Sequence, residues 1–445
     1  MKFVGALRSR LIRLALNPKS RAARRRIAEL RRRLRRQPHI VSAFLELDDP
    51  YSYLVSHYLP GLCEHYGIEV RLYVVEALEG AYRPRPDMLA EYAELDCACL
   101  ARELGVPFLD IGPAPSFEHR RALLDAFADS RKSPEFDRQL LQALAQFWRG
   151  DAEGVRRRLS STGKAGQRAQ MLAENRALLV KLGHYNSAML HYAGEWYWGI
   201  DRLHYLTERL DALGLRREAA APPPHLAVRQ AASVGLPVRP PGIARGLPPL
   251  ELFFSFRSPY SYLSLARVFS IADAFGIELK IRPVLPMVMR GLQVPRSKLV
   301  YIVQDAGREA ERLGIPFGRF YDPVGAGVER CMAVLAYATS EKREREFVVN
   351  AAEAIWARGI DVATDAGMRK VTARTGLFWP DVKIAMNSDS WRADADDNRE
   401  SMMSSGCWGV PTIRLGEFVA WGQDRDWLLV RHIEELCDSG NGILV

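Results

Sequence analysis

The chain of 445 residues is too long for one ordinary domain, and we expect two or three. Its hydrophobic content of 48% and charged content of 26% are typical of a soluble globular protein, and the lack of an apolar run of about 18 residues excludes a predicted membrane span. The net charge of +9 comes from residues 1–40, which contain 14 Lys and Arg and one acidic residue, Glu29, so that residues 41–445 carry −4. The basic pI therefore does not indicate a general nucleic-acid-binding protein.

Residues 1–40 form a basic N-terminal extension in which we predict an Arg-dominated helix. Its Ile27, Leu30 and Leu34 make a narrow apolar stripe, which favours contact with an anionic membrane surface. A solvated basic extension remains the default interpretation, and a transit peptide or a contact for RNA or DNA are further alternatives, although we expect no nucleic-acid partner. The segment has no apolar h-region and no small-residue cleavage site, so no secretory signal is predicted.

The rest of the chain contains an internal repeat. Matching segments recur 209 residues apart, and a further pair recurs 223 apart, which indicates loops of different length late in each copy. Because chance matches would not keep register over so long a stretch, we infer a tandem duplication. The two copies, 41–215 and 250–438, are joined by a linker, 216–249, that contains eight prolines. The matching segments are Pro50-Tyr51-Ser52-Tyr53-Leu54 with Pro259-Tyr260-Ser261-Tyr262-Leu263, Gly67-Ile68-Glu69 with Gly276-Ile277-Glu278, Asp96 with Asp305, and Trp198-Gly199 and Asp201-Arg202 with Trp421-Gly422 and Asp424-Arg425.

Both copies begin with the same order of predicted elements. In the second copy we predict a buried strand, a helix that begins at Pro259, a second strand, a long helical stretch, two short strands around Gly416 and a closing helix. This order predicts an α/β fold of two tandem thioredoxin-like domains, each with a helical insertion, in which the first helix begins at the carboxyl edge of the sheet. The predicted ranges are 250–256, 260–275, 277–285, 297–406 and 424–436.

Ser258 lies at the junction between the first strand and the first helix of the second copy. A serine here is a preferred helix N-cap. The same geometry places a hydroxyl and backbone N–H groups at a helix N-terminus, which can hold an anion such as a thiolate. Position alone favours the cap.

Two later motifs carry the same ambiguity. Val410-Pro411, between a helix and a strand, is either an ordinary turn or a backbone site for an extended peptide. Asp424 at the start of the last helix is either a first-turn acid that interacts favourably with the helix dipole or a binding group for an α-ammonium.

Taken together in this order, Ser-Pro-Tyr-Ser-Tyr, Gly-Val-Pro-Thr and Trp-Gly-Gln-Asp-Arg resemble the family of 2-hydroxychromene-2-carboxylate isomerases and kappa-class glutathione transferases. That family belongs to the DsbA-like branch of the thioredoxin fold, where the proline is cis. The resemblance covers about 250–438 and, more faintly, 41–215. It implies glutathione as cofactor, with Ser258 as the catalytic group that favours the thiolate. It also implies that Val410 and Pro411 pair with the cysteinyl unit, and that Gln423, Asp424 and Arg425 hold the γ-glutamyl end.

The second copy departs from the family pattern after its second strand, where the usual Gly-Asn pair is missing. Gln293 is the candidate substitute for that asparagine. Arg290 and Lys298 are candidate partners for a substrate carboxylate, although solvated surface charges are the default interpretation.

The first copy departs further. Asp49 stands where the second copy has Ser258, and a carboxylate there would repel a thiolate and raise its pKa. The Val-Pro pair has no counterpart in Tyr185-Asn186-Ser187-Ala188-Met189, and Asp201-Arg202 alone is interpreted as structural. We interpret 41–215 as a degenerate partner domain, which supplies an internal pseudo-dimer contact or joins a homo-oligomer.

The cysteines indicate neither a dithiol nor a metal site. None of the six forms a C-x-x-C pair, and no His/Cys cluster has zinc-ligand spacing. Cys97 and Cys99 are interpreted as buried or incidental thiols, and Cys407 lies near the proposed site but is not expected to have a redox role. Reduced thiols and the missing secretory signal favour a cytoplasmic location, with peripheral membrane contact through residues 1–40.

The leading prediction is a glutathione-dependent isomerase acting on an electrophilic, aromatic-derived keto acid. A glutathione transferase that conjugates electrophiles is the enzymatic alternative, and a non-catalytic scaffold is the other. A disulfide oxidoreductase is disfavoured because no second thiol stands beside the position of Ser258.

Overall fold

The computed structural model describes residues 17–444 apart from 77, 79, 107–119, 122, 126–133, 152, 155–164, 218–243 and 439–442. The described residues divide into two compact units, a first unit within 22–233 and a second unit within 234–445. Residues 17–21, the start of helix α2, group with the second unit, and the rest of α2 belongs to the first. The division falls inside the predicted linker 216–249, most of which lies outside the described residues. No described helix is both long enough and apolar enough to cross a membrane.

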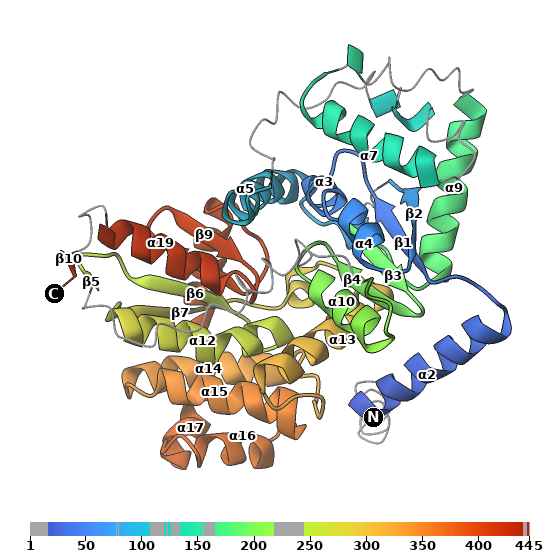
Figure 1. The fold of residues 1–445 in the computed structure, drawn as a ribbon. Coiled ribbons are helices and arrows are strands. Elements are labelled where there is room, and N and C mark those ends of the chain that lie inside the picture. Colours follow the sequence, from blue (N-terminus) through green and yellow to red (C-terminus); the bar gives the residue numbers. More distant parts are fainter. Residues whose placement is uncertain are drawn as a thin grey trace. The chain divides into compact units, whose positions relative to one another are not determined.

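The first unit alternates strands and helices around one sheet (Figure 1). Its described elements are α2 (Pro18–Leu34), β1 (Ile40–Leu45), α3 (Pro50–Ser56), α4 (Leu59–His65), β2 (Glu69–Val74), a 3-10 turn (Gly80–Tyr82), α5 (Pro86–Leu104), α7 (Pro134–Trp148), α9 (Ala165–Lys181), β3 (Met189–Tyr192), β4 (Glu195–Trp198) and α10 (Leu203–Ala212).

The second unit repeats that order with more helices. Its described elements are β5 (Ala244–Arg245), β6 (Leu250–Phe254), α12 (Pro259–Phe275), β7 (Leu279–Pro283), η2 (Met287–Arg290), α13 (Arg296–Leu313), α14 (Ala326–Ser340), α15 (Glu344–Glu353), the π-helical turn η3 (Ala354–Arg358), α16 (Asp365–Thr372), α17 (Trp379–Ala385), α18 (Trp391–Ser404), β8 (Thr412–Leu415), β9 (Phe418–Trp421), α19 (Asp426–Asp438) and β10 (Ile443–Leu444).

The two four-stranded sheets have the same topology. The strand order is β2-β1-β3-β4 in the first unit and β7-β6-β8-β9 in the second. In each sheet the first pair along the chain, β1 with β2 or β6 with β7, is parallel, and the other two pairs are antiparallel. A parallel pair needs a crossover, which α3 and α4 supply in the first unit and α12 supplies in the second. Each crossover helix therefore begins where the central strand ends.

Proline and glycine set the limits of these crossover helices. Pro50 and Pro259 occupy the first turn, where their missing N–H is not needed, and Gly276 ends α12 in the left-handed region at φ 63°. In the first unit the helix is interrupted, and Pro60 lies in the first turn of the following α4. Interior proline removes a helical hydrogen bond, which explains why the first unit has two short helices where the second unit has one long helix.

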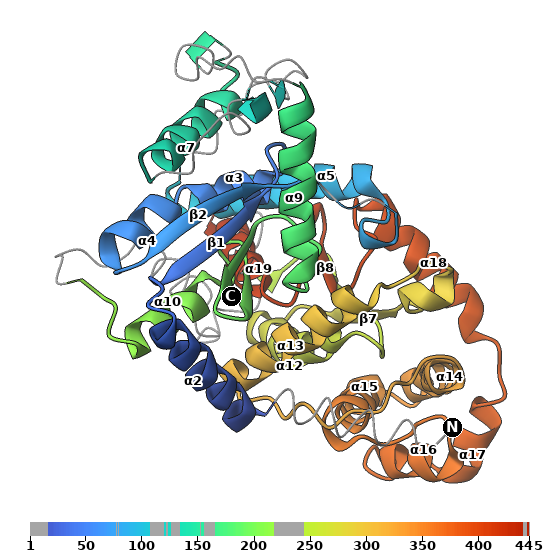
Figure 2. The same cartoon turned by 90° about the vertical axis from the view of Figure 1, so that its right-hand side faces the viewer.

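The helical insertion of the second unit packs on the crossover helix. In both views α14 to α17 lie beyond α12 from the sheet (Figures 1 and 2). All five residues of β6 are buried, as expected for a central strand covered on both faces. The predicted helical stretch 297–406 is thus a set of separate helices, because turns at Gly314, Gly325 and Gly359 interrupt it. The short strand pair of β5 with β10 lies outside the predicted range 250–438.

Candidate active site

Ser258 is the N-cap of α12 and also touches the loop that precedes β8. Its backbone is extended (φ −97°, ψ 116°), and its Oγ accepts a hydrogen bond from the Ser261 N–H at 3.1 Å. The same hydroxyl donates to the Val410 carbonyl oxygen at 3.3 Å. Ser258 and Val410 are both half-buried. The structure therefore brings two of the predicted site residues together, with the hydroxyl between a helix N-terminus and a peptide carbonyl.

The loop opposite Ser258 is tightly packed. The Val410–Pro411 peptide bond is cis, as the resemblance implies. A Cβ at Gly409 would lie 2.2 Å from the Trp421 ring, so only glycine fits there. Trp408 packs edge-on against Trp421 with ring centroids 5.1 Å apart. These contacts hold the backbone of Val410 at the surface of the site.

The Ser258 junction is held from behind by residues of the helical insertion. The Trp356 indole N–H donates to the Phe256 carbonyl oxygen at 3.1 Å. Arg257 forms a bidentate ion pair with Asp322 at 2.7 and 2.9 Å. Sequence reasoning did not assign either contact, because the partners are 100 and 65 residues away. Trp356 and Asp322 position the junction.

The turn after β9 has two buried side chains and one half-buried side chain. Gln423 is buried and donates to Glu309 Oε2 at 2.9 Å, and Arg425 is buried as well. Asp424 is half-buried, with its Oδ1 3.6 Å from Arg425 Nη1. Of the three predicted γ-glutamyl residues, Asp424 alone is partly accessible to solvent. Gln423 and Arg425 are therefore suited to shape this turn from inside.

Two cations lie beside Trp408. Arg290 donates to the Trp408 carbonyl oxygen at 3.2 Å, and the Lys298 ammonium lies 5.7 Å from the centre of its ring. Both cations are half-buried, so they are not the solvated surface charges of the default interpretation. Burial lowers the pKa of Lys298 to about 8, and burial followed by the charge of Arg399 lowers the pKa of Arg290. Gln293, the candidate substitute for the missing asparagine, is exposed.

At the corresponding junction of the first unit, the Asp49 carboxylate accepts hydrogen bonds from two backbone N–H groups and two hydroxyls. Asp49, 4% exposed, caps α3 by accepting from the backbone N–H groups of Tyr51 and Ser52 at 3.2 Å. The hydroxyls of Ser52 and Ser187 donate to Asp49 Oδ2 at 2.7 and 2.9 Å. Ser187 precedes β3 as Val410 precedes β8. Burial raises the pKa of Asp49, although the hydroxyl donors oppose this effect.

None of the six cysteines forms a disulfide bond. Cys97 is buried and Cys99 is half-buried, in agreement with their interpretation as buried or incidental thiols, and Cys407 is buried as well. In the part of the chain that the structure describes, no group of three His, Cys, Asp or Glu side chains is arranged to hold a metal ion.

Comparison with known proteins adds a family for the second unit. Residues 249–434 match the family model of the DSBA-like thioredoxin domain. The 2-hydroxychromene-2-carboxylate isomerase of Pseudomonas putida is 25% identical over 196 residues, which cover 42% of this chain and 95% of that protein. The isomerase of the same name from Sphingobium xenophagum is 24% identical over 184 residues, 40% of this chain and 93% of that one. A solved 2-hydroxychromene-2-carboxylate isomerase superposes with a TM-score of 0.38 and 23% identity, over 43% of this chain and 97% of that one.

Proposed function

Because residues 249–434 form a DsbA-like thioredoxin domain, we propose that the second unit is a glutathione-dependent isomerase of an electrophilic, aromatic-derived keto acid. The observation that carries this proposal is the Ser258 hydroxyl, which lies at the N-terminus of α12 and contacts the Val410 carbonyl. Two groups suited to a cysteinyl unit, a hydroxyl for the sulfur and a peptide edge for the backbone, thus lie side by side.

These two groups can exchange partners when glutathione binds. The Ser258 hydroxyl donates to the Val410 carbonyl over a long distance, 3.3 Å, and its proton can rotate toward a sulfur. The Val410 carbonyl is then left to accept the cysteinyl N–H. The Ser258 oxygen keeps its bond from Ser261 throughout, so the cap is retained. Binding of the cofactor and orientation of the hydroxyl are coupled in this way.

Bound glutathione, held by Ser258, Val410 and Asp424, would supply a thiolate nucleophile for reversible addition to a conjugated carbon of the substrate, which would let the former double bond rotate. The hydrogen bond from Ser258 and the positive end of the α12 dipole favour the charged form of the sulfur. The same two effects stabilise the sulfur each time it is expelled. No proton needs to be lost or gained in the net reaction, because the product is an isomer of the substrate.

Asp424 binds the γ-glutamyl ammonium in this proposal. Its carboxylate is the partly accessible group of the turn after β9, whereas Gln423 and Arg425 lie inside. We assign Gln423 and Arg425 to positioning. The bond from Gln423 to the buried Glu309 ties the turn to α13 and so fixes where Asp424 stands.

Arg290 and Lys298 form the site for the substrate carboxylate. Both are half-buried beside Trp408, next to the loop that presents Val410. A desolvated cation attracts a carboxylate more strongly than a solvated one does, and the nearby indole offers a flat surface for an aromatic ring. This arrangement favours an aromatic acid as substrate.

We propose further that the first unit is a duplicated thioredoxin-like domain that has lost the thiolate site. The identical order and sense of its strands support a common origin. A buried carboxylate at Asp49, bonded by the Ser187 hydroxyl across the junction, leaves no neutral hydroxyl donor at the position of Ser258.

Calorimetric titration with glutathione followed by product analysis tests the proposal. We expect binding at millimolar ligand or below, and an isomer of the substrate with glutathione recovered unchanged. A stable conjugate would favour a transferase. Absence of binding would contradict the proposal and favour a scaffold.

A further inference from the structure

Helix α2 has one face that packs on the first unit and an opposite face that is exposed to solvent. Within residues 22–34 the half-buried residues recur at helical spacing, and successive residues of an α-helix are about 100° apart, which puts them on one side. Figure 2 shows α2 beside the end of the sheet where β1 begins. The half-buried positions on this inner face are Arg25, Ala28, Glu29 and Arg32.

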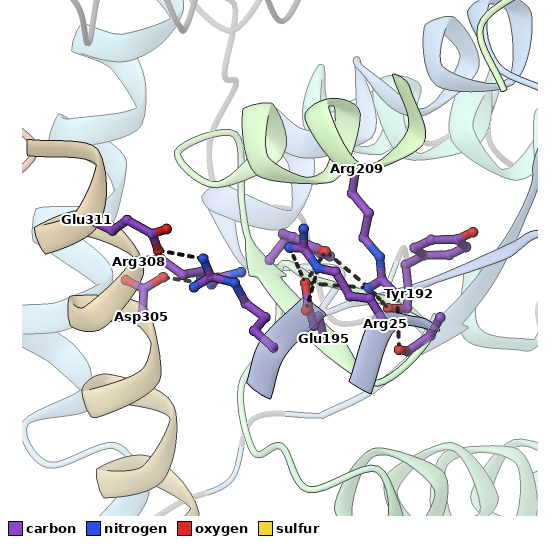
Figure 3. Close-up of polar contacts among 10 residues, drawn as sticks. Arg25, Tyr192, Glu195, Arg209, Asp305, Arg308 and Glu311 are labelled. Atoms are coloured by element: carbon purple, nitrogen blue, oxygen red, sulfur yellow. Dashed lines mark hydrogen bonds and ion pairs between the residues drawn. The ribbon is translucent and has the colours of Figure 1, made fainter. Parts of the chain in front are cut away.

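The inner face is fixed by a part-buried ion pair. Arg25 donates from Nε and Nη2 to the two carboxylate oxygens of Glu195 in β4, each at 2.8 Å. Figure 3 shows Arg25 and Arg209 directed at the same carboxylate, with Arg209 Nη1 3.5 Å from it. Burial of Glu195 is outweighed by the bond from Arg25 and the charge of Arg209, so its pKa is lowered to about 2. Glu195 is therefore ionised at neutral pH, and its ion pair with Arg25 ties α2 to β4.

Glu29, the one acidic residue among residues 1–40, forms ion pairs with arginines of the same helix. Glu29 accepts from Arg32 Nη2 and from Arg33 Nε, both at 2.7 Å. Since Glu29 lies on the inner face, it places no negative charge on the outer one.

The outer face carries an apolar stripe with arginines along both edges. Ile27, Leu30 and Leu34 are 49%, 58% and 76% exposed and, at about 100° per residue, lie within roughly 60° of one another. The same arithmetic puts this stripe opposite the inner face. The exposed arginines on its edges are Arg24 and Arg31 on one side and Arg26 and Arg33 on the other.

We propose that α2 is an interfacial helix that binds the surface of an anionic lipid bilayer. Leucine and isoleucine side chains along the centre enter the acyl boundary, while the flanking arginines reach lipid phosphates and carboxylates. A nucleic acid would place its phosphates against the centre of a binding face, where this helix has apolar side chains and no cation. Because Arg25 holds the inner face on β4, the helix lies flat on the membrane and carries the first unit with it.

Co-sedimentation of the full chain with vesicles tests this proposal. Vesicles of equal parts phosphatidylcholine and phosphatidylserine should bind the protein, whereas phosphatidylcholine alone should not. Replacing the stripe (Ile27→Ser, Leu30→Ser, Leu34→Ser) should weaken binding by roughly tenfold or more with no change in the far-ultraviolet circular dichroism. The matched control Phe378→Ser, Ile384→Ser removes two apolar side chains that are 65% and 72% exposed elsewhere and should leave binding unchanged.

Three outcomes would overturn the proposal. The first is equal binding to both kinds of vesicle, and the second is unchanged binding by the stripe variant. The third is a chain that ignores vesicles but binds duplex DNA or RNA, or that forms a dimer which the stripe variant loses. That outcome would assign the face to a nucleic acid or to a second copy.

Discussion

The strand-to-helix junctions before α3 and before α12 have different capping residues, Asp49 in the first unit and Ser258 in the second. Each follows a central strand and enters a helix through Pro-Tyr-Ser-Tyr. In both units the tyrosine after the proline donates to an aspartate at 2.8 Å, Tyr51 to Asp96 and Tyr260 to Asp305. The capping residue is a carboxylate in one and a hydroxyl in the other. The two units thus share the tyrosine–aspartate contact beside the junction and differ in the capping group.

Both capping side chains accept hydrogen bonds from backbone N–H groups at the helix N-terminus. A carboxylate cap repels a nearby anion, whereas a hydroxyl cap can donate a hydrogen bond to it. The Asp49 carboxylate is buried, accepts from four donors and repels a thiolate. Ser258 accepts from one backbone N–H and still has a proton to donate. Our proposal therefore separates helix capping from thiolate binding, and substitutions in matched pairs can test this separation.

The largest effect on activity is expected at Ser258, with Asp49 as the matched position in the first unit. Ser258→Ala removes a hydrogen bond to a charged sulfur, which is worth about 1.5–3 kcal/mol, so glutathione-dependent kcat/KM should fall about 10- to 150-fold. Asp49→Ala should leave kcat/KM unchanged and lower the thermal stability of the first unit. Steady-state kinetics and thermal melts measure both.

Loss of a cap also weakens a helix, by about 1 kcal/mol, and this effect needs its own control. Thr364 caps α16 in the same unit by accepting from the Gly367 N–H at 3.1 Å. Thr364→Ala should lower stability about as much as Ser258→Ala and leave turnover intact. Equal losses of turnover in the two variants would reduce Ser258 to a structural cap.

The turns that follow β4 and β9 give the second matched pair. Asp424→Asn removes the charge that holds an ammonium, and we expect the KM for glutathione to rise about tenfold with kcat nearly unchanged. Asp201→Asn makes the same change in the first unit and should have no kinetic effect. A kinetic effect of Asp201→Asn would instead place a working glutathione site in the first unit.

The order of strands and helices was predictable from local sequence, whereas contacts between side chains far apart in the sequence were not. The order of strands and helices follows from Pro259, Gly276 and the apolar runs between them, all of which act within a few residues. Which side chains of the last turn face solvent depends on Glu309, which lies 114 residues before its partner Gln423.

The same limit applies to the first unit. The repulsive effect of Asp49 was predicted from its residue type, but its bond from Ser187, 138 residues away, required the folded chain. The break between α3 and α4 was not predicted, because the prediction for residues 41–215 relied on the segments that match residues 250–438. Pro60 lies outside those segments and has no counterpart in the second unit.

Lys298 gives a smaller effect that depends on pH. The second unit has a half-buried lysine where the first copy has Leu89, 209 residues earlier. With a pKa of about 8, Lys298 is charged below that pH, so affinity for a carboxylate substrate should fall as pH rises through 8. Lys298→Met should raise KM a few-fold at pH 7 and abolish this dependence. A KM profile that the substitution leaves unchanged would place the carboxylate elsewhere.

The smallest effect is expected where the two units agree. Tyr51→Phe and Tyr260→Phe each remove one hydrogen bond to a buried aspartate and should each cost about 1 kcal/mol of unfolding free energy. Chemical denaturation measures the two losses. A loss of unfolding free energy in only one of the two variants would show that the tyrosine–aspartate bond stabilises one unit and not the other.

The pKa of the glutathione thiol in the complex tests the account most directly, since ultraviolet absorbance reports thiolate as pH is varied. We expect the pKa to be lower in complex with the native chain than in free solution, to return toward the free value in Ser258→Ala, and to stay low in Asp49→Ala. Bound glutathione with an unshifted pKa, or a shift that survives Ser258→Ala, would contradict the assignment of Ser258.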